Sequence, residues 1–222
     1  AQHIVKKGIA AMIMDQPFFA MLALQLNLRE ELTLPTLATD AVNLLYNPNY
    51  VKTLSMEQVK AAVAHEVMHV AFMHTTRRHE REPTKWNCAG DYCINPILKD
   101  SNFTLHPTWL YDDQYREKGA EEVYLLLPEP PKGQCWGDCE AQGGDGQDDQ
   151  GSGKQSKKGH LPGQACGGLR EPKHSDGSRY SEQEQKDLEH QTKVNVSNAA
   201  TAAKNMGKLP GDLARFVDEL LH

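Results

Sequence analysis

The sequence predicts an α+β fold, with several helices and a small set of short strands. Two capping-box patterns, Ser55–Gln58 and Ser181–Glu184, mark the starts of helices. A β-favouring run at Val42–Tyr46 predicts a strand. Helices and strands follow one another without a repeating strand–helix unit, which favours the α+β class over a parallel α/β sheet.

The N-terminal segment Gly8–Leu28 is rich in Ala, Met, Phe and Leu. Asp15, Gln16 and Pro17 interrupt it, so no run of about 18 apolar residues exists to cross a bilayer. A secretory signal would need a cleaner apolar stretch and a small-residue cleavage site. We therefore expect one or two amphipathic helices broken near Pro17, no membrane contact and no targeting signal.

Short strands are expected within Thr36–Tyr50, with Asn47-Pro48 ending the β-favouring run. The next element is a helix that opens at the Ser55 cap and continues to about Arg78. Further helices are expected at three places, in the ranges Thr84–Leu98, Gly119–Leu127 and Ser181–Met206.

Proline and glycine set the limits of these later helices. Pro96 should kink or end the helix that contains it. Gly207 should stop the helix that begins at Ser181, and a shorter one should run from about Pro210 to Leu221.

Composition divides the chain into three parts. Residues 1–127 form a dense globular core, and residues 181–222 supply C-terminal helices that complete the same domain. Between them, residues 128–180 are dominated by Gly, Gln, Asp, Ser, Lys and Pro. Such a stretch offers little apolar surface to offset the entropy of ordering it, so we expect a flexible insertion that is a candidate for contact with a protein partner.

The overall charge and the cysteines restrict the function further. The formal net charge is −6, which argues against a nucleic-acid-binding protein because such domains carry a basic excess. The five cysteines are odd in number and unevenly placed, which is poor support for a disulfide framework. We expect a reducing compartment, the cytoplasm.

The strongest signal is the run His65-Glu66-Val67-Met68-His69. On a helix, residues four apart lie on one face, so both imidazoles can reach one tetrahedral ion. Glu66 is rotated about 100° from His65 around the helix axis, close to the metal without being an obvious ligand. It is the candidate general base that takes a proton from water.

Apolar residues on the same predicted helix form a stripe roughly opposite the two histidines. This pattern predicts that the apolar side of the helix packs against the protein core and that the ligands face a cleft. This stripe consists of Met56, Val59, Val63, Val67 and Val70.

A catalytic zinc takes three protein ligands plus water, so a third ligand is needed. His74, His79 and Asp91 are candidates. A metzincin is excluded because Phe72 and Thr75 stand where that class has Gly and His. On a continuous helix His74 would lie about 140° from His69, on the apolar stripe and away from the metal. We expect it to be a hydrogen-bonded packing residue.

Asp91 is the favoured third ligand. It lies on the following predicted helix, at a spacing that suits a helical return over the site, and carboxylates are natural zinc ligands. Asn95 shares its face one turn later and is positioned to hydrogen-bond a ligand or the substrate. Trp86, Ala89 and Cys93, together with Ile97, form the other, core-facing stripe.

Several runs together resemble a known family. They are Ala64–Val70, the pattern Trp86-Asn87-x-Ala89-x-Asp91-Tyr92-x-Ile94-Asn95, Ala120–Tyr124, Ala38–Asp40, Tyr46–Pro48 and Gly207–Leu213. The family is the metallopeptidase domain often found ahead of von Willebrand A-like domains in bacteria and phages. The resemblance covers most of residues 1–127 and 181–222. It implies a zincin-like fold with a small mixed sheet, an active-site helix and a following ligand-bearing helix.

The resemblance also implies that His65, His69 and Asp91 bind Zn²⁺ and that Glu66 is the catalytic base. These 222 residues contain no von Willebrand A-like portion.

Weaker signals lie elsewhere. A second zinc site is conceivable from Cys135, Cys139, His160, Cys166 and His174, although the spacing is loose. Cys88 and Cys93 are expected in the core. A peptidase also needs a donor for the oxyanion, and the sequence does not choose among Tyr92, His106, Tyr111 and Tyr124.

The predicted function is zinc-dependent hydrolysis of peptide bonds by metal-activated water, of the gluzincin-like type with aspartate as third ligand. The substrate would be a peptide or a protein. One alternative is a zinc-binding regulatory or interaction module with little or no turnover. A zinc hydrolase acting on another amide is a third reading, because the motif specifies activated water and leaves the substrate open.

Overall fold

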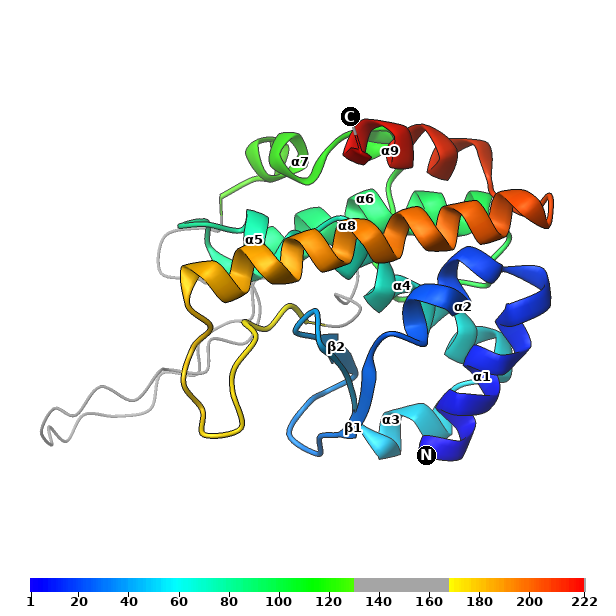
Figure 1. Ribbon diagram of the computed structural model, residues 1–222, viewed down its shortest axis with the longest axis horizontal. Coiled ribbons are helices and arrows are strands. Elements are labelled where there is room, and N and C mark those ends of the chain that lie inside the picture. The colour runs from blue at the N-terminus through cyan, green and yellow to red at the C-terminus, as the bar shows by residue number, and fades with distance from the viewer. Residues whose placement is uncertain (130–167, 222) are drawn as a thin grey trace, which may run out of the picture.

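A computed structural model of the chain describes residues 1–129 and 168–221 (Figure 1). Helices dominate these parts of the chain. In sequence order they are α1 (Gln2–Asp15), α2 (Pro17–Ala23), α3 (Pro48–Thr53), α4 (Met56–Ala71), α5 (His74–Arg77), α6 (Pro83–Asp100), α7 (Ala120–Leu126), α8 (Glu182–Asn205) and α9 (Gly211–Leu221), with a 3-10 turn at Asp113–Tyr115. None of the described helices is long and apolar enough to cross a membrane. The predicted pair of N-terminal helices broken near Pro17 is confirmed.

A small mixed sheet accompanies the helices. Its strands are β1 (Asn27–Glu30), β2 (Leu37–Thr39) and β3 (Asn43–Tyr46), in the order β1-β3-β2. β1 pairs with β3 in parallel, and β2 pairs with β3 antiparallel. The strands within Thr36–Tyr50 were predicted, whereas β1 was not. The α+β class with a small mixed sheet is therefore confirmed.

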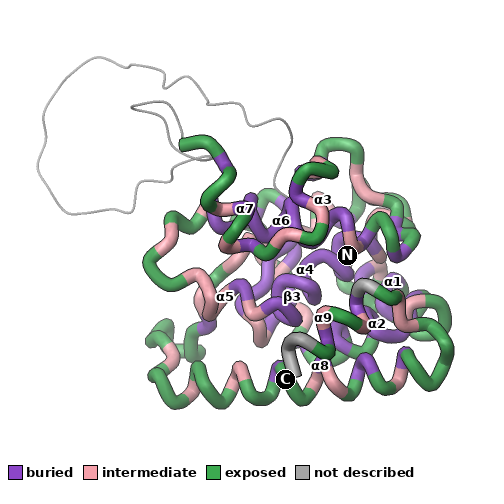
Figure 2. The backbone as a smooth tube through the Cα atoms, turned by 90° about the horizontal axis from the view of Figure 1, so that it is seen from above, coloured by how far each residue is buried: buried purple, intermediate pink, exposed green. Residues whose placement is uncertain are grey.

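Helix α4 lies at the centre of the molecule (Figure 2). It packs against α1, α2, α6, α8 and β2. Every residue from Ala61 to Ala71 is buried, as is Val59. The sequence predicted one apolar stripe and one face turned to a cleft, but from Ala61 onward α4 is covered on all sides. This burial demands that each polar side chain on α4 find a partner or a ligand.

Helix α4 ends earlier than predicted. The sequence suggested one helix to about Arg78, but α4 stops at Ala71, and α5 starts at His74. Met73 between them has φ +52°, in the left-handed region that non-glycine residues rarely adopt. Neither Gly nor Pro marks this position, so the break left no local signal in the sequence. The turn redirects the chain and changes where His74 points.

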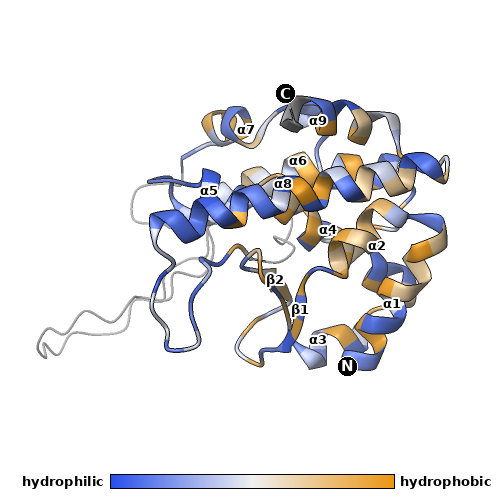
Figure 3. Cartoon of the chain, in the orientation of Figure 1, coloured by the Kyte–Doolittle hydropathy of each residue, from blue (hydrophilic) through white to orange (hydrophobic). Residues whose placement is uncertain are grey.

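The later helices match the predicted elements. Helix α6 continues past Pro96 to Asp100, so this proline does not end it. The Ser181–Glu184 capping box is present, and Gly207, with φ +64°, follows α8. Helix α8 packs against α2 and α4 through one buried stripe, while much of its visible surface is hydrophilic (Figure 3). The C-terminal helices thus share the core that the N-terminal part forms.

Residues 168–171 run along the outer edge of β2. The Thr39 amide donates to the Gly168 carbonyl (3.1 Å), and the Arg170 amide donates to the Thr39 carbonyl (2.9 Å). The Leu169 amide donates to Asn87 Oδ1 on α6 (3.2 Å), and Glu171 pairs with Arg78. We call residues 168–171 the edge segment. It lies in the range predicted as insertion, of which residues 130–167 are outside the described part of the chain.

Candidate metal centre

The His-Glu-x-x-His run lies on α4, as predicted. The Ser55 capping box is formed: the Gln58 amide donates to Ser55 Oγ (3.2 Å), and the Ser55 amide donates to Gln58 Oε1 (3.0 Å). His65, Glu66 and His69 each have zero exposed surface. Helix α6 packs against α4 and brings Asp91, equally buried, to the two histidines.

One potential metal-ligand atom from each of His65, His69 and Asp91 forms a nearly equilateral triangle, called the triangle below. His65 Nε2 and His69 Nε2 are 3.0 Å apart, and each is 3.2 Å from Asp91 Oδ1. Around a tetrahedral ion with bonds of 2.0–2.1 Å, two ligand atoms lie about 3.3–3.4 Å apart. The triangle is within a few tenths of an ångström of that spacing. Within the described residues, these three side chains form the group suited to hold a metal ion.

Asn95 fixes the tautomer of His65. Asn95 Nδ2 donates to the Leu110 carbonyl (2.6 Å), so its Oδ1 is the atom that faces His65 Nδ1 at 2.9 Å. An amide oxygen only accepts, so His65 Nδ1 carries a proton and Nε2 is the ring nitrogen that faces Asp91 and His69. Asn95 thus hydrogen-bonds a candidate ligand residue, whereas its predicted contact with a substrate stays a prediction. Such an outer partner is typical of metal-binding histidines.

His74 lies beside His69, and its predicted position is wrong. Its Nδ1 is 3.0 Å from His69 Nδ1, and the two rings meet edge to face. The prediction assumed a continuous helix, and the left-handed Met73 turns His74 back toward the site. The expectation that it is a buried, hydrogen-bonded histidine is confirmed. His79, another candidate third ligand, is exposed and outside the group.

The chemistry of the three side chains in the triangle favours a bound cation. Burial lowers the pKa of His69 to about 4, so its imidazole is neutral at physiological pH. Burial alone would raise the pKa of Asp91, but the neighbouring histidines outweigh it and hold the pKa below its ordinary value. Against the opposing effect of burial, Asp91 in turn raises the pKa of His65, which favours the charged imidazole that donates from Nε2 to Asp91 Oδ1; a cation held by the three atoms would take the place of that proton. Two imidazoles and a carboxylate suit Zn²⁺, so the residues fit the implied metal.

Glu66 is buried without a hydrogen-bond partner. Neither of its carboxyl oxygens has one among the described residues. Burial raises the pKa of Glu66 to about 8; nearby His65 opposes this shift and Asp91 adds to it. An unpaired buried carboxyl group is costly for a fold and marks functional sites. The structure thus places a buried carboxyl group of raised pKa one residue from a candidate ligand.

The remaining candidates are not part of the triangle. Cys88 and Cys93 are buried core thiols whose pKa burial raises, as expected of packing residues. The candidate oxyanion donors have other partners: Tyr111 binds Asp113, His106 binds Thr108, the Tyr124 hydroxyl accepts from the Glu82 amide, and Tyr92 packs on Tyr115. Of the conceivable second zinc site, only His174 is described, and it pairs with Glu184.

Sequence reasoning missed Gly90. It lies in the middle of α6, and a Cβ there would be 2.8 Å from His74 Nδ1 and 3.1 Å from His69 Cε1. A glycine inside a helix pattern signals close approach of another group, so this residue had a signal that was not used. The Trp109 ring, 5.5 Å from the His65 ring, also covers the site and had no signal.

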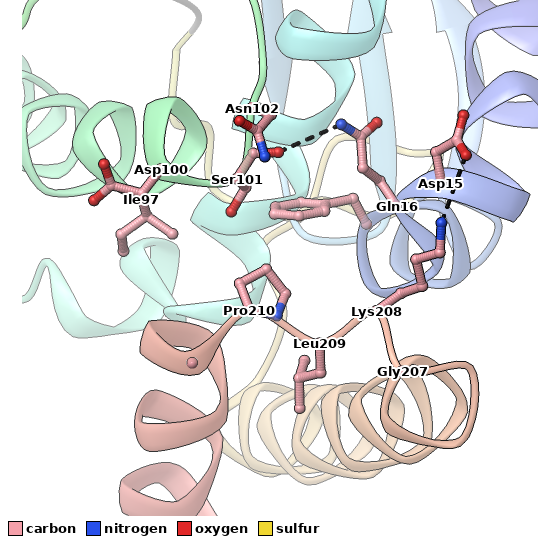
Figure 4. Close-up of a pocket in the computed structure, with 12 residues that line it drawn as sticks. Asp15, Gln16, Ile97, Asp100, Ser101, Asn102, Gly207, Lys208, Leu209 and Pro210 are labelled. Carbon is pink, nitrogen blue, oxygen red and sulfur yellow. Dashed lines mark hydrogen bonds and ion pairs between the residues drawn. The ribbon is translucent and has the colours of Figure 1, made fainter.

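A cavity of about 450 Å³ lies elsewhere, between the α1–α2 junction, the end of α6 and the α8–α9 linker (Figure 4). Gln16 Nε2 donates to the Ser101 carbonyl at its wall, and Lys208 pairs with Asp15. None of the metal-centre residues lines this cavity. It is therefore separate from the triangle.

The fold and the site define an α+β protein with a His-Glu-x-x-His helix and a candidate metal centre completed by aspartate. The chain belongs to the family described as "putative metallopeptidase domain", whose model matches residues 1–222. An uncharacterised protein of Thermotoga maritima is 28% identical over 135 residues, which cover 58% of this chain and 34% of that protein. The chain thus matches about a third of that relative's length. No solved structure gives a significant match.

Proposed function

We propose that this chain is a zinc-dependent peptidase with a zincin-like, gluzincin-type site in which His65, His69 and Asp91 hold the metal and Glu66 is the general base. The observation that carries the proposal is the triangle of three buried donor atoms 3.0–3.2 Å apart, next to an unpaired carboxyl group. Membership of a metallopeptidase family supports the same reaction.

The roles of the residues follow from their contacts. A Zn²⁺ ion held by the triangle supplies Lewis acidity to a carbonyl group and to water. Glu66, one residue from His65 and without a hydrogen-bond partner among the described residues, takes the proton from the attacking water and delivers it to the leaving amine. Asn95 keeps His65 in the tautomer that presents Nε2. Peptides as substrates, and a protein partner at residues 128–180, are parts of the proposal.

The test combines metal analysis with cleavage of a diverse peptide library. The wild-type protein should hold one zinc and cleave. Glu66→Gln should keep the zinc and lose cleavage by about 10²-fold or more, the contribution of a positioned general base. Asp91→Ala should lose most of the zinc. Full activity in Glu66→Gln would refute the base, and unchanged zinc in Asp91→Ala would refute the third ligand.

One observation favours a second function, a zinc-binding module with little turnover. All four centre residues have zero exposed surface, whereas hydrolysis requires a substrate carbonyl to reach the metal. Zinc at one equivalent with no cleavage of any library peptide would favour the module. Cleavage that disappears in Glu66→Gln would favour the peptidase.

A further inference from the structure

His74 is a buried residue that has no part in the metal binding or the proton transfer proposed above. Its Nδ1 is 3.0 Å from His69 Nδ1, on the side of the His69 ring away from the triangle. This contact determines which nitrogen of His69 carries the proton.

Two neutral imidazoles that share a hydrogen bond through their Nδ1 atoms need one donor and one acceptor. If His74 donates, the neutral His69 carries its proton on Nε2, which then has no lone pair for a metal. If His69 donates, its Nε2 lone pair points at His65 and Asp91. Only the second arrangement allows the triangle of acceptors to hold a cation.

The surroundings hold His74 in one place. Trp86 Nε1 donates to the His74 carbonyl (2.7 Å), and the His74 ring contacts the rings of Phe72 and Trp86. Gly90 provides the space, because a Cβ at that position would be 2.8 Å from His74 Nδ1. A mid-helix glycine costs about 1 kcal/mol relative to alanine, so a close contact of this kind explains its presence in α6.

We propose that His74 is a positioning residue that accepts the Nδ1 proton of His69, so that His69 presents Nε2 to the metal, and that Gly90 maintains this contact. The inference rests on the proposed metal centre and adds to it the device that selects the His69 tautomer. It parallels the role of Asn95 toward His65, so each histidine of the triangle has its own acceptor.

The experiment measures Zn²⁺ affinity by competition with a chromophoric chelator. His74→Leu fills the volume but removes the acceptor. His74→Asn places Oδ1 near the former Nδ1 and keeps it. Loss of such an outer partner costs about 10- to 100-fold in metal affinity. We therefore expect the Zn²⁺ affinity of His74→Leu to fall by that factor and the affinity of His74→Asn to stay within about threefold of wild type.

Gly90→Ala gives an independent variant that leaves His74 unchanged. It should weaken zinc binding in the same range, because the new methyl group would be 2.8 Å from His74 Nδ1 and 3.1 Å from His69 Cε1 and would push the two rings out of their contact. Gly8→Ala is the matched control: it is also a mid-helix glycine, and its Cβ would be 2.9 Å from Val59 Cγ1, away from the triangle. Gly8→Ala should keep wild-type affinity. Circular dichroism of each metal-free variant checks that it is folded.

The outcomes separate this inference from the proposed function. Wild-type affinity in His74→Leu would overturn the role of His74, and so would an equal loss in His74→Asn and His74→Leu, which would indicate packing alone. Failure of the wild-type protein itself to bind Zn²⁺ would instead overturn the metal centre. Loss in His74→Leu and Gly90→Ala, with retention in His74→Asn and Gly8→Ala, supports the inference.

Discussion

At the residue scale, the centre combines groups that a stable core would avoid. Glu66 is fully buried and unpaired among the described residues, and two imidazole nitrogens and a carboxylate oxygen lie 3.0–3.2 Å from one another with no exposed surface. An ion at the triangle would offset the second cost, while Glu66 is left for chemistry. Under the proposed function, the cost of burying Glu66 leaves its carboxyl group free to act as the base.

Replacing Glu66 by Met should therefore stabilise the metal-free protein. The change removes an unsatisfied buried carboxyl group and keeps a side chain of similar length and volume, so we expect a gain of about 1–3 kcal/mol in the free energy of unfolding. Urea denaturation in the presence of a chelator measures it. Glu66→Gln, which keeps a buried polar group, is the control and should gain less. A lower stability for Glu66→Met would show that the carboxyl group has a favourable partner.

At the element scale, the two helices that build the centre were largely predictable. The spacing of His65, His69 and Asp91 was enough to place them on α4 and α6, because their helical periods are regular. His74 could not be placed, because the left-handed turn at Met73 depends on tertiary packing and has no glycine to announce it. Strand β1 was missed for a related reason: it is polar and mostly exposed, and its partner β3 is distant in sequence.

The turn at Met73 provides a second prediction. A β-branched residue at φ +52° is strained, so Met73→Val should lower the free energy of unfolding by about 1–2 kcal/mol. It should also weaken zinc binding, because His74 follows directly. Met73→Gly adopts the same backbone without strain, and we expect it to remain near wild type in both properties. Thermal unfolding and chelator competition measure the pair. Equal behaviour of the two variants would contradict the conformational argument.

The edge segment provides a third prediction. Asn87 on α6 accepts a hydrogen bond from the Leu169 amide, while the Thr39 backbone on β2 is hydrogen-bonded to the backbone of the residues on either side. Asn87→Ala should cost about 0.5–1.5 kcal/mol and should expose the Leu169 and Arg170 amides to faster hydrogen exchange. Asn27→Ala is a control on β1, where the side chain is exposed. Unchanged exchange at Leu169 would show that β2 and the Arg78–Glu171 pair hold the segment without Asn87.

At the scale of the whole molecule, the triangle lies where two hydrophobic clusters meet. The larger cluster surrounds α4 and includes residues of α1, α2 and α8. The smaller one is formed by α6 residues such as Trp86 and Tyr92 with Leu110 and residues of α7. His65 and His69 lie on α4, and Asp91 lies on α6. A bound ion would therefore link the packing of these two helices. Metal binding is thus expected to stabilise the entire fold.

The fourth prediction follows from this linkage. Any ligand that binds only the folded state stabilises it by RT ln(1 + [L]/Kd), about 2.7 kcal/mol when free Zn²⁺ is 100 times Kd. For a chain of this size each kcal/mol moves Tm by about 2–4 °C, so chelation should lower Tm by roughly 5–11 °C. Asp91→Ala should show almost no difference between zinc and chelator, whereas Glu66→Gln should keep the full shift. A shift of the same size in Asp91→Ala would place the stabilising zinc elsewhere in the chain, and the cysteines at 135, 139 and 166 would be the next residues to replace.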